Sequence, residues 1–495
     1  MLFSNDHKTI AIKGVLFALI IAAIAGLFGL TFRLELTLPG IQLFGARTYM
    51  GLMTFHGVAM VLAFLIPILF SLCYFMMPKM LKLDRLHWAV LANLSFWVLF
   101  FAAVLLILSR PDFTWTVYAP MSLRVGGNLV WLGYVTVFLI GVSEFLAGLV
   151  FVRNAFAWKG KWMEMPLMGW AMLALGVTLI FSTPALSLVG LFLLTDWMEV
   201  TALFDPARGG SVKTFLWIFW FYGHPAVYLP FIPAIAIIYT FLPRFLGRPV
   251  WSYKSGVIAF VLLTILGAMV FHHHFQPDVS VHTWVQRFFQ FATLLIFIPS
   301  TLHVFNWIAS IWEGPIPDSA RRALPFKFMI GAFIMVIYGG VTAFINAQIS
   351  IDMDFIHNTY WVPAHFHAMF LGFCGQIAIG AIYYIWPYIT GRQFNRRLGN
   401  IHFWLWQIGI FGKLTMMYIL GWNYFPRWVV DYLPRSEWAI PQMGLTFFGF
   451  LIGLGFLVMV YNLAVSARRS APKIAGDPWK LEDSTAAAPV AAPAE

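Results

Sequence analysis

The stretch from Tyr360 to Ile385, YWVPAHFHAMFLGFCGQIAIGAIYYI, is long and apolar enough to cross a bilayer as one helix. Two histidines, His365 and His367, lie near its start. Side chains two residues apart on a helix point about 200° apart, so the two imidazoles face opposite sides of one backbone. One metal ion cannot easily take both rings, whereas two groups that flank the helix can take one each. For an isolated pair, the alternative is that one ring packs in the interior and the other caps a loop.

The rest of the chain is similarly apolar. Hydrophobic residues make up 61% of it and charged residues only 10%, against about a quarter charged in soluble domains. We therefore predict an all-α integral membrane protein, with room in 495 residues for about a dozen spans. The net charge of +11 does not indicate nucleic-acid binding, because the basic residues lie in short loops. Cys73 and Cys374 lie inside apolar segments and no CxxCH motif occurs, so electrons must reach any redox centre from elsewhere.

Twelve transmembrane helices are expected in one membrane domain over residues 1–469. A disordered cytoplasmic tail, rich in Ala, Pro and acidic residues, is expected over residues 470–495. The predicted helices are 12–32, 50–76, 87–108, 128–152, 165–194, 214–243, 254–275, 286–312, 326–350, 360–386, 401–422 and 441–466.

Basic residues gather in alternate loops, after the second, fourth, sixth, eighth and tenth helices. The positive-inside rule places these loops and both termini in the cytoplasm. The loop after the second helix carries Lys79, Lys82 and Arg85, and the loop after the eighth carries Arg321, Arg322 and Lys327.

In this topology several histidines fall at one depth. His56 lies about two turns into the second helix and His224 about three turns into the sixth, both counted from outside. A run of three histidines, 272–274, ends the seventh helix, and His365 and His367 open the tenth. All therefore lie in the outer half of the membrane, where ionisable side chains are costly and are candidates for function. This layer favours cofactor ligation over core packing.

Local spacing suggests roles for these side chains. His224 and Tyr228 are four residues apart and share a helix face, so a phenol stands beside whatever His224 binds. Pro225 implies a break in the helical hydrogen bonds next to that histidine. Adjacent rings on a helix are about 100° apart, so His272 and His273 can converge on one ion while the third of the run faces elsewhere. Three imidazoles without thiolate or carboxylate suit copper or zinc, and a redox role favours copper.

Seven motifs along nearly the whole chain point to a known family. The chain closely resembles subunit I of the haem–copper oxidase superfamily, with haems and copper in the outer half of the membrane. The motifs stand in the family's order: TFHGVAM, LFDPARGG, FWFYGHPAVY, FHHHF, FIPSTLHVFNWIASIWEG, HNTYWVPAHFH and FPRW.

The resemblance implies two haems. His56 and His367 would be the axial ligands of a low-spin haem, and His365 the ligand of a high-spin haem. Phe366, between the two haem ligands, would lie between the haems. This agrees with the opposite directions of His365 and His367 on one helix.

The resemblance also implies one copper ion, held by His224, His272 and His273 and facing the high-spin iron. Tyr228 would be the tyrosine cross-linked to His224, which gives an electron and a proton when the O–O bond breaks.

A loose polar stripe is expected in the inner half of the sixth and eighth helices. It consists of Tyr239, Thr240, Ser300, His303 and Asn306. His303 stands where relatives often have a lysine, and a histidine titrates near neutral pH. The stripe would pass protons from the cytoplasm to the copper site; the alternative is helix–helix hydrogen bonding with an interfacial tyrosine.

Other positions depart from the family pattern or carry buried charge. Ala226 stands where many members have a proton-relaying glutamate. Glu144 and Lys413 lie mid-span, and each would relay protons, offset haem propionates or pair with a partner.

On the outer side, Arg427 matches the first of two family arginines near the haem propionates, and Trp428 replaces the second. Asn358 replaces an aspartate of many relatives, which argues against an accessory magnesium site there.

The function implied is that of a terminal respiratory oxidase, which reduces O2 to water with protons from the cytoplasm. Nitric oxide reduction is the second hypothesis, against which Tyr228 and the all-histidine ligand set argue. A twelve-span solute transporter would leave the histidine layer unexplained. The expected partners are the membrane and a subunit II with dinuclear copper or haem c, or else a quinol donor. The expected location is a bacterial or archaeal inner or plasma membrane.

Overall fold

The computed structural model describes residues 3–474 except 113–114, 126, 277–280 and 469–470. Its first half contains α1 (His7–Glu35), α2 (Ala46–Val58), the π-helical η1 (Ala59–Leu65), α3 (Ile66–Met80), α4 (Ala89–Ser109), α5 (Met121–Arg124), α6 (Val130–Ala155), η2 (Trp162–Glu164), α7 (Leu167–Trp197), η3 (Pro206–Arg208), α8 (Val212–Gly223) and α9 (Pro225–Leu246). The second half contains α10 (Tyr253–Gly267), the 3-10 turn η4 (Phe271–Phe275), α11 (Thr283–Leu295), α12 (Phe297–Trp312), α13 (Asp318–Arg322), α14 (Leu324–Asn346), α15 (Ile349–Ile351), the π-helical η5 (Asp352–Ile356), α16 (Trp361–His367), the π-helical η6 (Ala368–Gly375), α17 (Gln376–Thr390), α18 (Arg396–Trp422) and α19 (Ser436–Ser466).

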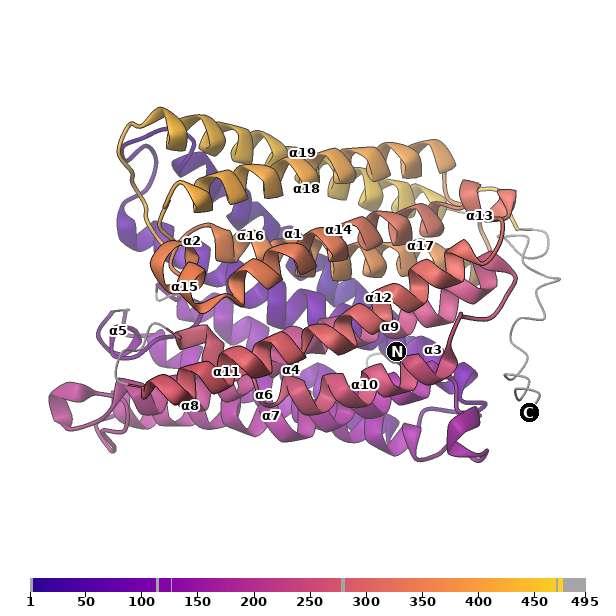
Figure 1. The fold of residues 1–495 in the computed structure, drawn as a ribbon, viewed down its shortest axis with the longest axis horizontal. Helices are drawn as coiled ribbons and strands as arrows, with labels where there is room; N and C mark the ends of the chain where they lie inside the picture. Colours follow the sequence, from indigo (N-terminus) through magenta and orange to yellow (C-terminus); the bar gives the residue numbers. More distant parts are fainter. Residues whose placement is uncertain (1–2, 113–114, 126, 277–280, 469–470, 475–495) are drawn as a thin grey trace.

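The long helices run side by side in one bundle (Figure 1), with α18 and α19 along one edge and α6, α7 and α8 along the other. Within the described residues, eleven continuous helical stretches are long and apolar enough to cross a membrane. The shorter apolar helix α10 makes twelve, in agreement with the predicted twelve-helix membrane bundle.

Residue chemistry sets where these helices begin and end. The side chains of Asp6, Ser211 and Ser252 accept the backbone N–H of a residue in the first turn of α1, α8 and α10. Gly247 and Gly391 follow α9 and α17 with φ of 67° and 64°, a left-handed backbone that glycine adopts without strain.

One predicted helix end is wrong. The seventh helix was expected over 254–275, but α10 ends at Gly267 and the histidine run lies in the separate turn η4. The predicted tail lies outside the described residues except for its first few. There Lys473 pairs with Arg392 in an isolated antiparallel bridge, and the Gln393 N–H donates to the Pro472 carbonyl at 2.9 Å.

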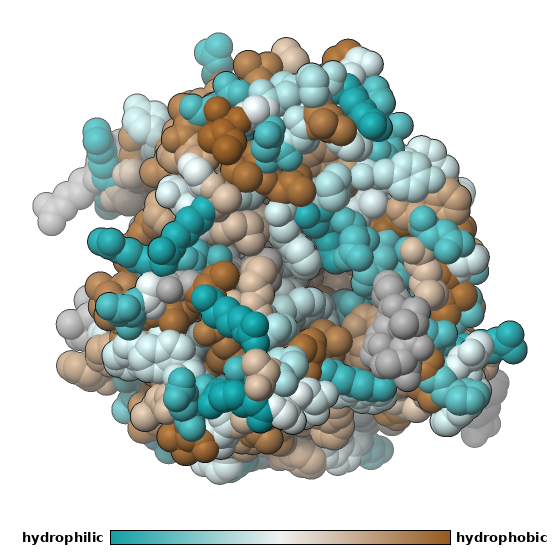
Figure 2. Space-filling model, turned by 90° about the vertical axis from the view of Figure 1, so that its left-hand side faces the viewer, coloured by the Kyte–Doolittle hydropathy of each residue, from teal (hydrophilic) through white to brown (hydrophobic). Residues whose placement is uncertain are grey.

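Burial differs strongly between the helices. The most apolar windows of the α8–α9 and α16–α17 stretches are each 89% buried, against 22% in α19. Large apolar side chains such as Trp312 and Ile440 are exposed on the outer helices, as lipid contact requires. Figure 2 looks onto the left-hand end of the bundle, where hydrophilic side chains gather. The two innermost stretches carry His224, His365 and His367.

Candidate functional site

His56 is held against α1. It lies in the last turn of α2, three residues before the π-helical η1 begins, and π-helical turns often occur at functional sites. Its Nδ1–H donates to the Ala25 carbonyl of α1 at 2.8 Å. One turn further along α1, Gly29 leaves the space that the ring takes, since a Cβ there would lie 2.6 Å from Nδ1. This anchoring leaves the Nε2 lone pair of His56 for a metal.

The two histidines of α16 are anchored differently. His365 Nδ1–H donates to the Gly339 carbonyl of α14 at 3.1 Å, whereas His367 Nδ1–H donates to the Pro363 carbonyl of its own helix at 2.7 Å. Another π-helical turn, η6, follows directly after His367. His56 lies three residues before η1 and His367 directly before η6, and these two π-helical turns contact each other. His56 and His367 therefore form one potential ligand pair.

His365 belongs to a second location, because its ring is anchored to the Gly339 carbonyl of α14 and points to the opposite side of α16 from His367. Phe366 lies between the two histidines of α16. Its ring centroid is 4.2 Å from that of Phe370 and 5.8 Å from that of Trp115.

His224 stands in the break between α8 and α9 that Pro225 predicts, since α8 ends at Gly223 and α9 begins at Pro225. Its Nε2 is buried without a hydrogen-bond partner. Such an atom in a protein interior normally binds something. The ligand atoms of His224, His273 and His274 all lie within 4.8 Å of one another. His224 Nδ1 and His274 Nε2 are 3.0 Å apart, and His273 Nδ1 is 2.9 Å from the Thr293 hydroxyl.

The structure differs from the expectation at the histidine run. His272 does not join this cluster; it stacks on Phe289 with a centroid distance of 4.8 Å. His274 joins it instead and lies flat on Trp220 at 3.9 Å. The expectation assumed the 100° spacing of an α-helix, whereas η4 is a 3-10 turn with about 120° between successive side chains. The aromatic neighbours Phe289 and Trp220 then select the direction of each ring.

Tyr228 lies beside His224 as its spacing predicts, with ring centroids 4.9 Å apart. Gly267, the last residue of α10, provides the room for it. A Cβ at Gly267 would lie 3.1 Å from the Tyr228 ring.

The predicted polar stripe is only partly assembled. Tyr239, His303 and Asn306 form a buried chain, with 2.9 Å from the Tyr239 hydroxyl to His303 Nδ1 and 3.2 Å from Asn306 Nδ2 to that hydroxyl. Thr240 and Ser300 instead donate to carbonyls of their own helices.

Glu144 of α6 is buried and accepts a hydrogen bond from the Tyr222 hydroxyl of α8 at 2.8 Å. Tyr222 was not among the predicted site residues. Its signal was present, because Tyr222 stands two residues before His224 in the motif FWFYGHPAVY.

Arg427 lies outside the spans, near the outer histidines. It donates to the Asn358 side chain at 3.0 Å and stacks over Trp428 at 4.5 Å, while its Nε is buried without a hydrogen-bond partner. Burial lowers the pKa of the Arg427 guanidinium. A carboxylate on that Nε would meet an unsatisfied donor.

These residues fit haem and copper chemistry. His56, His365 and His367 each give Nδ1–H to a backbone carbonyl, which is the usual arrangement of a metal-binding histidine. The cluster at His224 contains only imidazoles, which suit copper.

Comparisons with known proteins agree on one family. Residues 9–459 match the family described as cytochrome c and quinol oxidase polypeptide I. The chain is 31% identical over 490 residues to the cytochrome c oxidase polypeptide 1 of Halobacterium salinarum, covering 97% of this chain and 81% of that protein. It is 28% identical over 487 residues to the quinol oxidase subunit 1 of Bacillus subtilis, covering 96% and 74%.

Two further similarities concern a fused relative and a solved fold. The chain is 30% identical over 493 residues to the heme-copper oxidase subunit I+III of Aeropyrum pernix, covering 96% of this chain and 58% of that protein. The fold matches a cryo-EM structure of a heme-copper terminal oxidase dimer with a TM-score of 0.81 at 20% identity, covering 96% of this chain and 86% of the other.

Proposed function

This chain belongs to the cytochrome c and quinol oxidase polypeptide I family and is a haem–copper oxygen reductase, and on this premise we propose that it reduces O2 to water with protons taken from the cytoplasm. The observation that carries the proposal is the convergence of His224, His273 and His274 beside Tyr228.

Three histidines hold two haems in this proposal. His56 and His367 would hold a low-spin haem, and His365, which faces the other side of α16, would hold a high-spin haem. Their anchored Nδ1 atoms support this, because each ring is fixed with Nε2 left to bind. Arg427 would meet a haem propionate. When bound, the haems and the copper supply the electron transfer and the oxygen chemistry.

Copper is held by His224, His273 and one further histidine. The family pattern assigns that place to His272, whereas the geometry favours His274, 3.0 Å from His224. The copper content of His272→Ala and of His274→Ala decides between them, since only the ligand's removal releases the ion. Tyr228, beside His224, holds a proton and supplies it with an electron as the O–O bond breaks.

Protons reach this site along Tyr239, His303 and Asn306. Asn306 bonds the backbone of Ser252, so the chain begins at the loop between α9 and α10. The positive-inside rule puts this loop, with Arg248, in the cytoplasm together with both termini.

Nitric oxide reduction is the second candidate. The described residues that converge at His224 are all histidines and Tyr228 stands beside them, which favours O2. Electrons come from a partner subunit II with dinuclear copper or haem c, or from a quinol, in a bacterial or archaeal inner or plasma membrane.

The test is a purified complex in which O2 and NO consumption are measured side by side with haem and copper content. The proposal expects two haems, bound copper and O2 consumption that exceeds NO consumption. Faster NO consumption, or a colourless and copper-free complex, would contradict it.

A further inference from the structure

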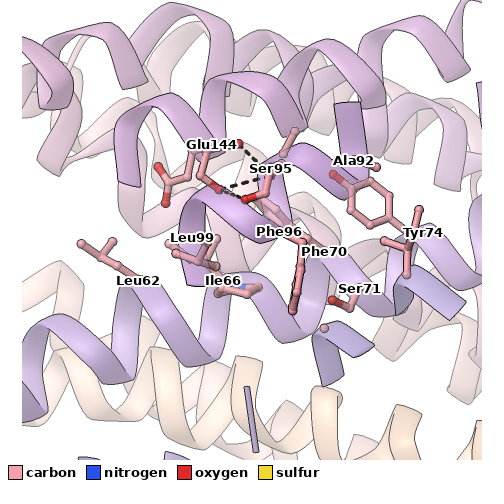
Figure 3. A pocket seen from close by; sticks show the side chains of 15 residues that line it. Leu62, Ile66, Phe70, Ser71, Tyr74, Ala92, Ser95, Phe96, Leu99 and Glu144 are labelled. Atoms are coloured by element: carbon pink, nitrogen blue, oxygen red, sulfur yellow. Dashed lines mark hydrogen bonds between the residues drawn. The ribbon is translucent and has the colours of Figure 1, made fainter. Parts of the chain in front are cut away.

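A small cavity lies among α1, η1, α3, α4 and α6. Its volume is about 40 Å³, enough for roughly three or four waters at about 10–15 Å³ each. Its lining is largely apolar but includes the polar side chains of Ser71, Tyr74, Ser95, Ser143 and Glu144. In Figure 3, Glu144 lies at one end of the lining, Ser71 and Tyr74 at the other, and Ser95 between them.

The polar groups along this cavity are only partly satisfied by the protein. Ser95 and Ser143 donate to each other's backbone carbonyls at 2.8 and 2.7 Å. The Tyr74 hydroxyl and the Glu144 Oε1 are buried and have no hydrogen-bond partner among the residues that the structure describes. Buried polar atoms without protein partners beside a cavity of this size are where ordered waters bind.

Glu144 connects this cavity to the segment that carries His224. Its Oε2 accepts from the Tyr222 hydroxyl at 2.8 Å, and Tyr222 stands on α8 two residues before His224. Glu144 is 4% exposed at the middle of a membrane-crossing helix, and it forms no salt bridge with a cation of the described residues. Such a carboxyl group is expensive to bury as an ion, so it is suited to hold a proton.

We propose that Glu144 is the proton-holding group of a second proton route, which runs through the water-filled cavity lined by Ser71, Tyr74, Ser95 and Ser143. Each transfer from Glu144 leaves a carboxylate, and a proton arriving through the cavity restores the acid. The proton released is consumed by the oxygen that the proposed enzyme reduces, and the Tyr222 hydroxyl orients the carboxyl group toward α8. The inference rests on the proposed function, because O2 reduction creates the demand for protons.

The cytoplasmic direction of this route follows from the helices that build it. The cavity contacts Ile10 and Gly14 near the start of α1 and the stretch of α3 from Ile66 to Tyr74, and α3 ends at Met80, just after Lys79. Glu144 lies eleven residues before the end of α6, so about 16 Å of helix separates it from that membrane surface. Waters and serine hydroxyls can cover this distance in a few steps, whereas Ala226 of α9 offers no proton-holding group.

The experiment uses the purified complex in lipid vesicles and compares Glu144→Gln, Glu144→Asp and Glu164→Gln. Glu164, the exposed last residue of η2, is the control carboxylate. Proton uptake during a single reaction with O2 is followed with a pH-sensitive dye, and haem absorption and copper content are measured on the same samples. The inference expects Glu144→Gln to slow uptake by about 100-fold or more, the range for a positioned proton-transfer group. Glu144→Asp should retain most of the rate and Glu164→Gln all of it.

A second readout does not depend on turnover. The infrared difference spectrum between oxidised and reduced protein should contain a carboxylic-acid C=O band that Glu144→Gln removes. Tyr222→Phe should shift that band, because the 2.8 Å hydrogen bond is lost while Glu144 stays in place. If Glu144→Gln does not assemble, the band shift in Tyr222→Phe still tests the inference.

Three results would overturn the inference. The first is normal proton uptake in Glu144→Gln with intact haem and copper, and the second is an infrared C=O band that changes in neither Glu144→Gln nor Tyr222→Phe. The third is a loss of proton uptake in Glu144→Asp equal to that in Glu144→Gln, together with altered haem absorption. A wild-type complex that does not consume O2 would instead refute the proposed function, and the infrared test would still report on Glu144.

Discussion

Gly29→Ala should selectively disturb the low-spin haem. The added methyl group would lie 2.6 Å from Nδ1 and 2.7 Å from Cε1 of His56, closer than real Cβ contacts. The ring must retreat by about 0.8 Å to reach the 3.4 Å of ordinary contact, which pulls Nδ1 away from the Ala25 carbonyl 2.8 Å away. Overpacking of this kind costs about 1–3 kcal/mol. If this cost reduces the binding free energy of the low-spin haem, the affinity for that haem falls about 5- to 150-fold.

The assay is the absorption spectrum of the reduced, purified complex during titration with a haem-binding competitor such as apomyoglobin. Gly26→Ala is the matched control on the same helix, because its methyl group would meet only the end of Met60 at 3.8 Å. We expect Gly29→Ala to release the low-spin haem faster than Gly26→Ala, with the high-spin haem retained in both. Equal haem retention in the two variants would refute the ligand role of His56.

Three further variants test the remaining assignments. His56→Ala should lose the low-spin haem band and keep the high-spin one; an unchanged spectrum would remove His56 from the ligand set. Tyr228→Phe should keep both haems and lose most O2 reduction, so normal turnover would exclude the role of its hydroxyl. His303→Leu should slow turnover about tenfold or more without changing metal content. Its control is His402→Leu, since His402 is equally buried and bonds Tyr383 at 3.0 Å much as His303 bonds Tyr239 at 2.9 Å. Equal turnover rates in these two variants would show that the Tyr239–His303 hydrogen bond has only a structural role.

The sequence allowed the spans and the helix break to be predicted because their causes are local. Apolar runs of more than 18 residues have no alternative to a membrane or a deep core. Pro225 removes one helical hydrogen bond, and the helix does break at its neighbour His224. The opposite directions of His365 and His367 follow from helical geometry alone.

The ring directions in the histidine run could not be predicted. They depend on where α10 ends, and the apolar run continues past Gly267 without a proline or a polar stop. They also depend on Trp220 and Phe289, which lie far from the run in sequence or beyond the next loop. Tyr222 could be recognised from its place beside His224, but its contact with Glu144 could not be predicted, since the two residues are 78 positions apart.

The claim on which the account depends is that imidazoles from separate membrane-crossing helices hold the metals. Its most direct measurement is the copper-to-haem ratio of the purified complex, compared between wild type and His224→Ala. The difference removes any copper that a partner subunit carries. We expect His224→Ala to lose one copper per two haem groups while its haem content stays the same. Equal copper in the two samples would contradict the account.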